Sequence, residues 1–248
     1  MTENTFSNVD AAGPTGHLDV LGSIPAEYRQ SVLEQCGRRR VKRNDVVWHQ
    51  GDPANYVGFL VQGKAMSTYA SPNGKTGVTG FWARGDLLGA ADLGVATIRQ
   101  LTVRCLEDSN ILMLPIPKFF EISRRFPEVS QAVIVALSVR LRWVAHLALT
   151  LETQNAFGRI CTILLTLSET FPQEHPEGTL IDLSMTNESL AAIVGVARQS
   201  ANITLNDLKR RSLIRMDGRR IVVRDREGLQ AIAYQADGID NLPSPNEP

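Results

Sequence analysis

The sequence predicts an α+β protein in which short antiparallel strands come first, one long helix follows, and a small helix-rich module ends the chain. Three observations predict it: β-prone runs separated by glycines, a heptad pattern after Pro127, and two short helices followed by a hairpin near the C-terminus. Of the 248 residues, 43% are hydrophobic and 21% charged, and the 26 basic side chains equal the acidic ones in number. This composition is typical of a globular protein and excludes wholesale disorder.

The first structured region is expected over residues 18–126. Its β-prone runs cover 46–48, 56–61, 65–70, 77–82, 101–105 and 111–114. Because no long helix separates them, they favour an antiparallel roll or barrel over a parallel sheet. Asn73-Gly74 lies between two runs and predicts a hairpin with a type I′ turn, which needs positive φ at both central positions.

A long helix is expected over residues 127–155, because Pro127 suits a first helical turn. Apolar residues recur along it at spacings of three and four, namely Ile134, Leu137, Leu141, Val144, Ala148 and Leu151. A helix of this length spans about 40 Å, which is more than the neighbouring strands need. We therefore expect this seam to pack against a second copy of the chain. A second apolar face with Trp143 and Leu147 leaves a single buried core helix as the alternative.

The long helix is not expected to cross a membrane. Its apolar stretch, residues 133–151, is interrupted by Arg140, Arg142 and His146, so it cannot lie in lipid without burying charge. The N-terminus has neither a basic start nor an apolar core, and no secretory signal is expected.

Cysteine usage indicates a reducing compartment. Cys36, Cys105 and Cys161 are odd in number and far apart, so they form neither a disulfide framework nor a CxxC pair. A cytoplasmic protein fits best, and a redox role for these thiols stays open. Residues 1–17 and 237–248 lack periodicity and are expected to be flexible tails.

The C-terminal module, residues 156–236, contains the pattern of a helix-turn-helix. Thr186 can cap a first helix, Gly195 can turn the chain, and a second helix is expected over residues 197–211. Small Ala191 permits close approach of the two helices. The buried stripe of the second helix is expected to contain Val196, Ala201, Leu205 and Leu208.

The same module carries the residue types that bind duplex DNA. The candidates are Thr186 for phosphates and Arg198, Gln199, Ser200 and Asn202 for base edges or phosphates. A β-wing turning at Asp217-Gly218 adds Arg219 and Arg220. Residues 198–224 contain eight basic and two acidic residues within a chain of zero net charge. Such a basic surface is typical of phosphate binding, although a solvated helix face can carry similar charge.

Several motifs in this order carry a family resemblance. They are His49-Gln50-Gly51-Asp52, Gly63, Gly85-Asp86 with Leu88-Gly89, Phe157-Gly158-Arg159-Ile160 and Ile193-Val194-Gly195. On these, residues 21–234 resemble the Crp/Fnr family of bacterial transcription regulators. The resemblance implies a β-roll like that of cyclic nucleotide-binding domains, a dimerisation helix and a winged helix-turn-helix. It also implies a homodimer on a near-palindromic DNA site and contact with RNA polymerase.

The effector pocket implied by the resemblance departs from the pattern of cyclic-AMP-binding members. Those members place a Gly-Glu pair, an Arg-Ser pair and two hydroxyl residues around the nucleotide. The matching positions are Gly89-Ala90, Arg99-Gln100 and Val144-Ala145, where only the arginine is kept. An apolar small molecule or no ligand is therefore expected, with a divergent cyclic-nucleotide pocket as the alternative. Arg99 is expected either to bind another anion or to form a salt bridge with an acidic residue of the roll.

Other classes of function fit less well. A cupin-like metal enzyme needs clustered ligands, whereas His49 is the one histidine of the roll, and no GxxxxGK[ST] phosphate loop occurs. An Fnr-type iron–sulfur cluster needs four suitably placed cysteines. No enzyme activity, cofactor or metal is predicted. Gln199 and Ile203 replace a Glu and an Arg found in many relatives, so a sensor acting through a protein partner is a further alternative.

Overall fold

The computed structural model describes residues 18–74, 76–94 and 97–235, without the side chains of His146, Leu147, Leu151, Tyr234 and Gln235. The chain divides into two compact units, Met1–Val144 and Ala145–Pro248. The expected tails at 1–17 and 237–248 lie outside the described residues.

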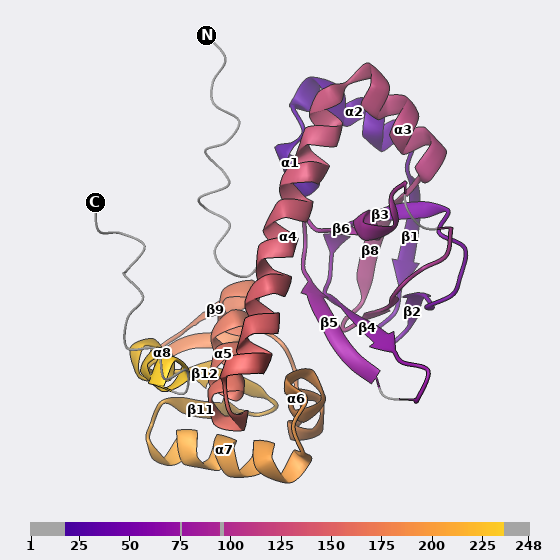
Figure 1. Cartoon of the computed structure of the whole chain (residues 1–248). Helices are drawn as coiled ribbons and strands as arrows, with labels where there is room; N and C mark the ends of the chain where they lie inside the picture. The colour runs from indigo at the N-terminus through magenta and orange to yellow at the C-terminus, as the bar shows by residue number, and fades with distance from the viewer. Residues whose placement is uncertain (1–17, 75, 95–96, 236–248) are drawn as a thin grey trace. The chain divides into compact units, whose positions relative to one another are not determined.

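The N-terminal unit is an antiparallel β-roll with helices at both ends of its sequence (Figure 1). Its strands form two four-stranded sheets, ordered β1-β8-β3-β6 and β2-β7-β4-β5. The elements are α1 (Val20–Ser23), α2 (Ala26–Glu34), β1 (Gly37–Val41), β2 (Val46–Trp48), β3 (Tyr56–Gln62), β4 (Ala65–Ala70), β5 (Thr76–Trp82), β6 (Leu87–Leu88), η1 (Ala90–Asp92), β7 (Thr102–Cys105), β8 (Ser109–Pro115) and α3 (Ile116–Arg125). The predicted fold class is confirmed.

Two apolar clusters hold this unit together. One contains Leu60, Val103 and Ile111 from strands of both sheets. The other joins Phe59 of β3 to side chains of the flanking helices, Val133 among them. Strand β3 supplies both clusters because successive side chains of a strand point to opposite faces.

Strand β1 was missed by the sequence analysis because it is almost entirely polar. Its residues Gly37 to Arg40 are exposed and only Val41 is buried. The strand lies at the edge of its sheet, where arginine side chains can keep their charged ends in water. An edge strand of this kind has no apolar alternation for a sequence pattern to detect.

The hairpin between β4 and β5 has a different turn from the predicted one. Gly74 has a φ of 82°, but Asn73 is not among the described residues with positive φ, so the expected type I′ turn is wrong. The N–H of Gly74 donates to the carbonyl oxygen of Ser71 at 2.9 Å. Pro72 therefore occupies the second position of a four-residue turn, where its fixed φ is favourable.

Helix α4 (Pro127–Thr153) starts at Pro127 and continues across the boundary of the two units. Val129, Val133, Val139 and Trp143 are buried. By contrast, the seam residues remain exposed in the single chain: Ile134 by 60%, Leu137 by 37%, Leu141 by 68% and Val144 by 45%. Ala148 is exposed too, and the side chain of Leu151 is not described.

Helix α4 is long and apolar enough to cross a membrane by length and composition alone, over Pro127–Thr150. Only 25% of the most apolar stretch is buried. The buried face nevertheless packs in the core of the β-roll through Val129, Ala132 and Val133. The apolar character of α4 thus belongs to two faces, one of them already covered by the roll.

The C-terminal unit surrounds the buried helix α5 (Ala156–Thr170) with smaller elements (Figure 1). These are β9 (Pro172–His175), β10 (Gly178–Ile181), α6 (Asn187–Val194), α7 (Arg198–Arg210), β11 (Ile214–Asp217), β12 (Arg220–Val223) and α8 (Arg226–Gln235). The four strands form one antiparallel sheet in the order β11-β12-β10-β9. Ile160, Leu164 and Leu167 of α5 are fully buried and form the centre of this unit.

Candidate nucleic-acid interface and effector pocket

Helices α6 and α7 form a helix-turn-helix whose geometry is set by a cap and a glycine. The Thr186 hydroxyl oxygen accepts from the N–H of Ser189 at 3.0 Å and caps α6. At the other end, Gly195 adopts a φ of 71°, a left-handed conformation that glycine tolerates best. Ala191 is buried, as expected for a helix pair in close contact.

One face of α7 is buried and the opposite face is exposed. The buried side chains are Ala201, Thr204, Leu205 and Leu208, while Val196, which precedes the helix, is half-buried. The exposed stripe consists of Gln199, Ile203, Asn206 and Arg210, at helical spacings of four, three and four. Asn206 was not singled out by the sequence analysis, although its spacing from Gln199 was available as a signal.

The predicted base-reading residues are placed differently from one another. Arg198 and Gln199 are exposed at the start of α7, whereas Ser200 and Asn202 are half-buried. The Asn202 side-chain oxygen accepts from the Asn187 amide at 2.6 Å and so joins α7 to α6. The sequence alone did not show this bond, because the two residues are fifteen positions apart.

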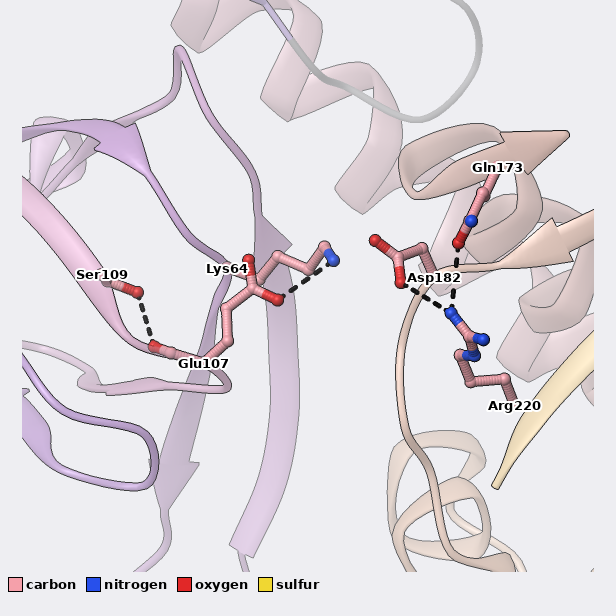
Figure 2. A network of polar contacts seen from close by, with 6 residues as sticks. All are labelled: Lys64, Glu107, Ser109, Gln173, Asp182 and Arg220. Atoms are coloured by element: carbon pink, nitrogen blue, oxygen red, sulfur yellow. Dashed lines mark hydrogen bonds and ion pairs between the residues drawn. The ribbon is translucent and has the colours of Figure 1, made fainter. Parts of the chain in front are cut away.

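The β-wing is present, but its two arginines have different surroundings. Strands β11 and β12 pair from Ile214↔Val223 to Asp217↔Arg220, and Arg219 is exposed beside the turn. Arg220 Nη1 donates to Gln173 Oε1 at 3.1 Å and lies 3.4 Å from Asp182 Oδ1, as Figure 2 shows. Because these contacts engage the guanidinium, Arg219 is the freer cation of the wing.

The basic segment 198–224 is more neutralised than its sequence suggests. Asp207 pairs with both Arg210 and Arg211 at 2.7 Å, and Arg215 pairs with Glu177. The guanidinium of Arg215 also lowers the pKa of Glu177 through a hydrogen bond. Glu177 and Asp182 lie outside the counted segment, so the net charge of the segment overstates that of the surface.

Four cations of this surface remain without an ion pair among the described residues: Arg198, Lys209, Arg219 and Arg224. All four are exposed. They are therefore the side chains available to neutralise phosphates.

In the β-roll, Arg99 is held by the protein itself. Its side chain is 2% exposed, and Nη1 lies 2.9 Å from Asp92 Oδ2. Nη2 donates to the carbonyl oxygen of Tyr56, and the guanidinium lies 3.9 Å from the centre of the Trp48 ring. Of the two expectations for Arg99, the structure contains the internal salt bridge.

The other pocket candidates differ in burial, and Gly89 is the one that lies close to Arg99. Gly89 has a φ of 77°, and a Cβ there would lie 2.5 Å from Arg99 Nη1. Ala90 is buried, whereas Gln100 is exposed. Val144 and Ala145 are exposed on α4. Val144, the last residue of the N-terminal unit, therefore does not line the interior of the roll in the single chain.

A second arginine, which the sequence analysis did not connect with the pocket, joins α4 to β5. The Arg140 guanidinium lies between two indoles, 4.1 Å from the centre of Trp82 and 4.4 Å from that of Trp143. It also donates to the carbonyl oxygens of Phe81 and Thr79 at 3.4 and 3.5 Å. A Cβ on Gly80 would lie 1.4 Å from Arg140 Nη2, so the glycine provides the necessary space. Burial lowers the pKa of Arg140 to about 10, although Asp86 opposes the shift.

The three cysteines have the environment of structural thiols. Burial raises the pKa of Cys36 to about 11 and that of Cys161 to about 12, and it also raises the pKa of Cys105. A raised pKa leaves little thiolate near neutral pH, and the thiolate is the reactive form. Among the described residues, no group of three or more His, Cys, Asp or Glu is arranged to hold a metal.

A helix-turn-helix with a wing, joined to a β-roll through a long helix, defines a DNA-binding regulator. Residues 38–126 match the cyclic nucleotide-binding domain, and residues 158–232 match the Crp-like helix-turn-helix domain. The chain belongs to the Crp/Fnr family of transcription regulators, which bind DNA and are not enzymes.

Individual relatives are distant but extend over most of the chain. The transcriptional activator protein Anr of Pseudomonas aeruginosa is 24% identical, with 85% of this chain and 86% of Anr covered. The cAMP-activated global transcriptional regulator Vfr of the same species is 23% identical, with 79% and 94% covered. Among solved structures, the c-di-GMP-responsive regulator CLP of Xanthomonas campestris is 24% identical at a TM-score of 0.71, with 80% and 99% covered. At this identity the structural likeness shows the fold alone.

The internal salt bridge of Arg99 predicts a large effect on stability. Replacing Asp92 by Ala leaves a buried guanidinium without its carboxylate, and we expect a loss of about 3–5 kcal/mol in the free energy of unfolding. Urea unfolding followed by tryptophan fluorescence measures it, because Trp48, Trp82 and Trp143 all lie in the N-terminal unit. The double variant D92A/R99M is expected to recover most of the loss. An unchanged unfolding midpoint in D92A would contradict the importance of the pair.

The exposure of Arg198 predicts a role in DNA recognition. We expect Arg198→Ala to weaken binding to a selected duplex by about 1–3 kcal/mol and to relax its preference at one base pair, because Arg reads guanine bidentately. Fluorescence anisotropy with a set of single-base-pair variants measures both effects. Equal weakening on every duplex would instead make Arg198 a phosphate contact.

Proposed function

We propose that the protein acts in the cytoplasm as a homodimer that reads a near-palindromic DNA site with the two copies of α7. The observation that carries this proposal is the stripe of exposed polar and apolar side chains on α7, opposite a face buried in the module. A recognition helix placed in the major groove needs such a face. The proposal includes contact with RNA polymerase, for which membership of the family is the support.

The homodimer is supported by the exposed face of α4. Ile134, Leu137, Leu141 and Val144 are large apolar side chains at heptad spacing and are all exposed in the single chain. A contiguous apolar stripe of this kind marks an interaction site. A second copy of the chain presents the same stripe. If a twofold axis parallel to α4 related the two copies, their stripes would pack against each other and both would be buried.

We further propose that cyclic AMP is not the effector and that the regulator binds DNA without a small molecule. A cyclic phosphate that took Nη1 of Arg99 from Asp92 would leave that carboxylate, which is 5% exposed, as an unpaired buried charge. Leaving one charge of a buried ion pair without its partner costs several kcal/mol. The names of relatives, cAMP-activated for Vfr and c-di-GMP-responsive for CLP, support the view that effectors vary on this fold.

DNA binding without an effector is tested directly. We expect the purified protein to retain specific genomic fragments in a gel-shift assay at about 150 mM salt with heparin as competitor, because charge-only complexes weaken there. Added cyclic AMP is expected to change neither the affinity nor the fragments retained. A requirement for cyclic AMP would overturn the effector proposal, and equal binding to all duplexes would favour a sensor that acts through a protein partner.

The seam is tested by placing two charges in it. We expect the double variant L141D/V144D to be monomeric, because both carboxylates would enter the dry contact between two α4 helices. Light scattering after size exclusion measures the mass. Arg142→Asp is the matched control, since Arg142 is exposed on the same turn, lies outside the heptad positions and changes the charge by the same amount. A dimeric L141D/V144D variant would show that the seam is wrongly assigned.

A further inference from the structure

Ile203 is an unusual residue on the exposed stripe of α7. Its side chain is 62% exposed, although its neighbours on the stripe, Gln199 and Asn206, are polar. The buried face of the helix is formed by Ala201, Thr204 and Leu205 on the other side. Packing in the module therefore does not explain an isoleucine at this position.

The orientation of Ile203 is fixed by the rest of α7. Three of the buried residues anchor the helix through its opposite face, and Asn202 ties the same turn to α6 at 2.6 Å through Asn187. Isoleucine is also stiff in a helix, because β-branching leaves one strongly preferred χ1 rotamer. The apolar end of Ile203 is thus presented outward in a single direction.

The partner chemistry follows from the proposed function, on which this inference rests. In the major groove, the base edges carry hydrogen-bonding atoms, and the apolar group among them is the C5-methyl of thymine. Gln199 lies one helical turn before Ile203 on the same stripe and has the amide geometry to read adenine. Gln199 and Ile203, one helical turn apart on the stripe, therefore match neighbouring A·T pairs, the first through adenine and the second through the thymine methyl.

We propose that Ile203 is a specificity-determining residue that contacts a thymine methyl in each half-site. Four residues of helix rise about 6 Å, whereas base pairs are about 3.4 Å apart. The thymine lies therefore one or two base pairs from the pair that Gln199 reads. Where other sequences place an arginine for guanine, this chain selects an A·T pair.

The test removes the methyl group alone. Duplexes are first selected with the wild-type protein from a random pool, and each thymine of one half-site is then replaced in turn by deoxyuridine, which lacks only that methyl. At one position we expect about a fourfold loss of wild-type affinity, the effect of exposing one buried methyl group. The I203A variant is expected to bind the thymine and deoxyuridine duplexes equally at that position. The I203V variant, which keeps a branched apolar side chain, is expected to retain most of the discrimination.

The outcomes separate this inference from the proposed function. The thymine contact is overturned if a site is selected but its deoxyuridine replacements do not change the affinity. It is also overturned if they change the affinity of I203A as much as that of the wild type. In both cases sequence-specific DNA binding still stands. If no duplex is enriched, the proposed sequence-specific DNA binding is overturned, and the thymine contact, which rests on it, is overturned as well. The unfolding midpoint of I203A serves as the folding control, and no change is expected because the side chain is mostly exposed.

Discussion

A guanidinium that leaves water must find partners inside the protein, and two arginines of the β-roll satisfy this requirement in different ways. Arg99 is almost completely buried and has a carboxylate, a carbonyl oxygen and an indole face as partners. Arg140 has no such close carboxylate contact in the described structure and lies between the indoles of Trp82 and Trp143. Arginine suits both environments because its planar guanidinium stacks on aromatic faces and is more weakly hydrated than an ammonium.

The two arginines have consequences for the roll as a sensor. Arg99 and Trp48 fill the neighbourhood of Gly89 with protein atoms, where the family resemblance implied a ligand phosphate. Arg140 links the end of β5 to α4 through stacking and two carbonyl contacts. A link of this kind can hold the long helix on the roll without a bound nucleotide. These two local arrangements support the proposal of an effector-free regulator, whereas the fold, which relatives with different effectors share, does not decide it.

In the C-terminal unit, some arginines form ion pairs within the protein and others remain available for phosphates, a difference that the sequence does not show. The basic residues of segment 198–224 look alike in the sequence, yet Arg215 and Arg220 are engaged by Glu177 and Asp182. Such exposed pairs contribute little to stability, but they remove charge from the surface that would face phosphates. Arg198 and Arg219 keep their charge available. The number of basic residues in segment 198–224 correctly indicated DNA as the class of partner. The distribution of charge on the surface depends also on acidic residues from other strands and loops, such as Glu177 and Asp182.

The order of strands, long helix and helix-turn-helix could be predicted from the sequence, because periodicity, capping residues and glycines act over short distances along the chain. Thr186 and Gly195 fixed the ends of α6 in this way, and the heptad spacing of α4 identified the residues that the structure leaves exposed. Strand β1 escaped because an exposed edge carries no apolar signal, and the turn after β4 was misassigned because Pro72 outweighed Asn73-Gly74. The partners of Arg99, Arg140, Asn202 and Arg220 were decided only by the tertiary structure. Several of these contacts join residues distant in sequence, as Arg140 with Trp82 and Arg220 with Asp182 do, and only the folded chain sets which of these groups meet.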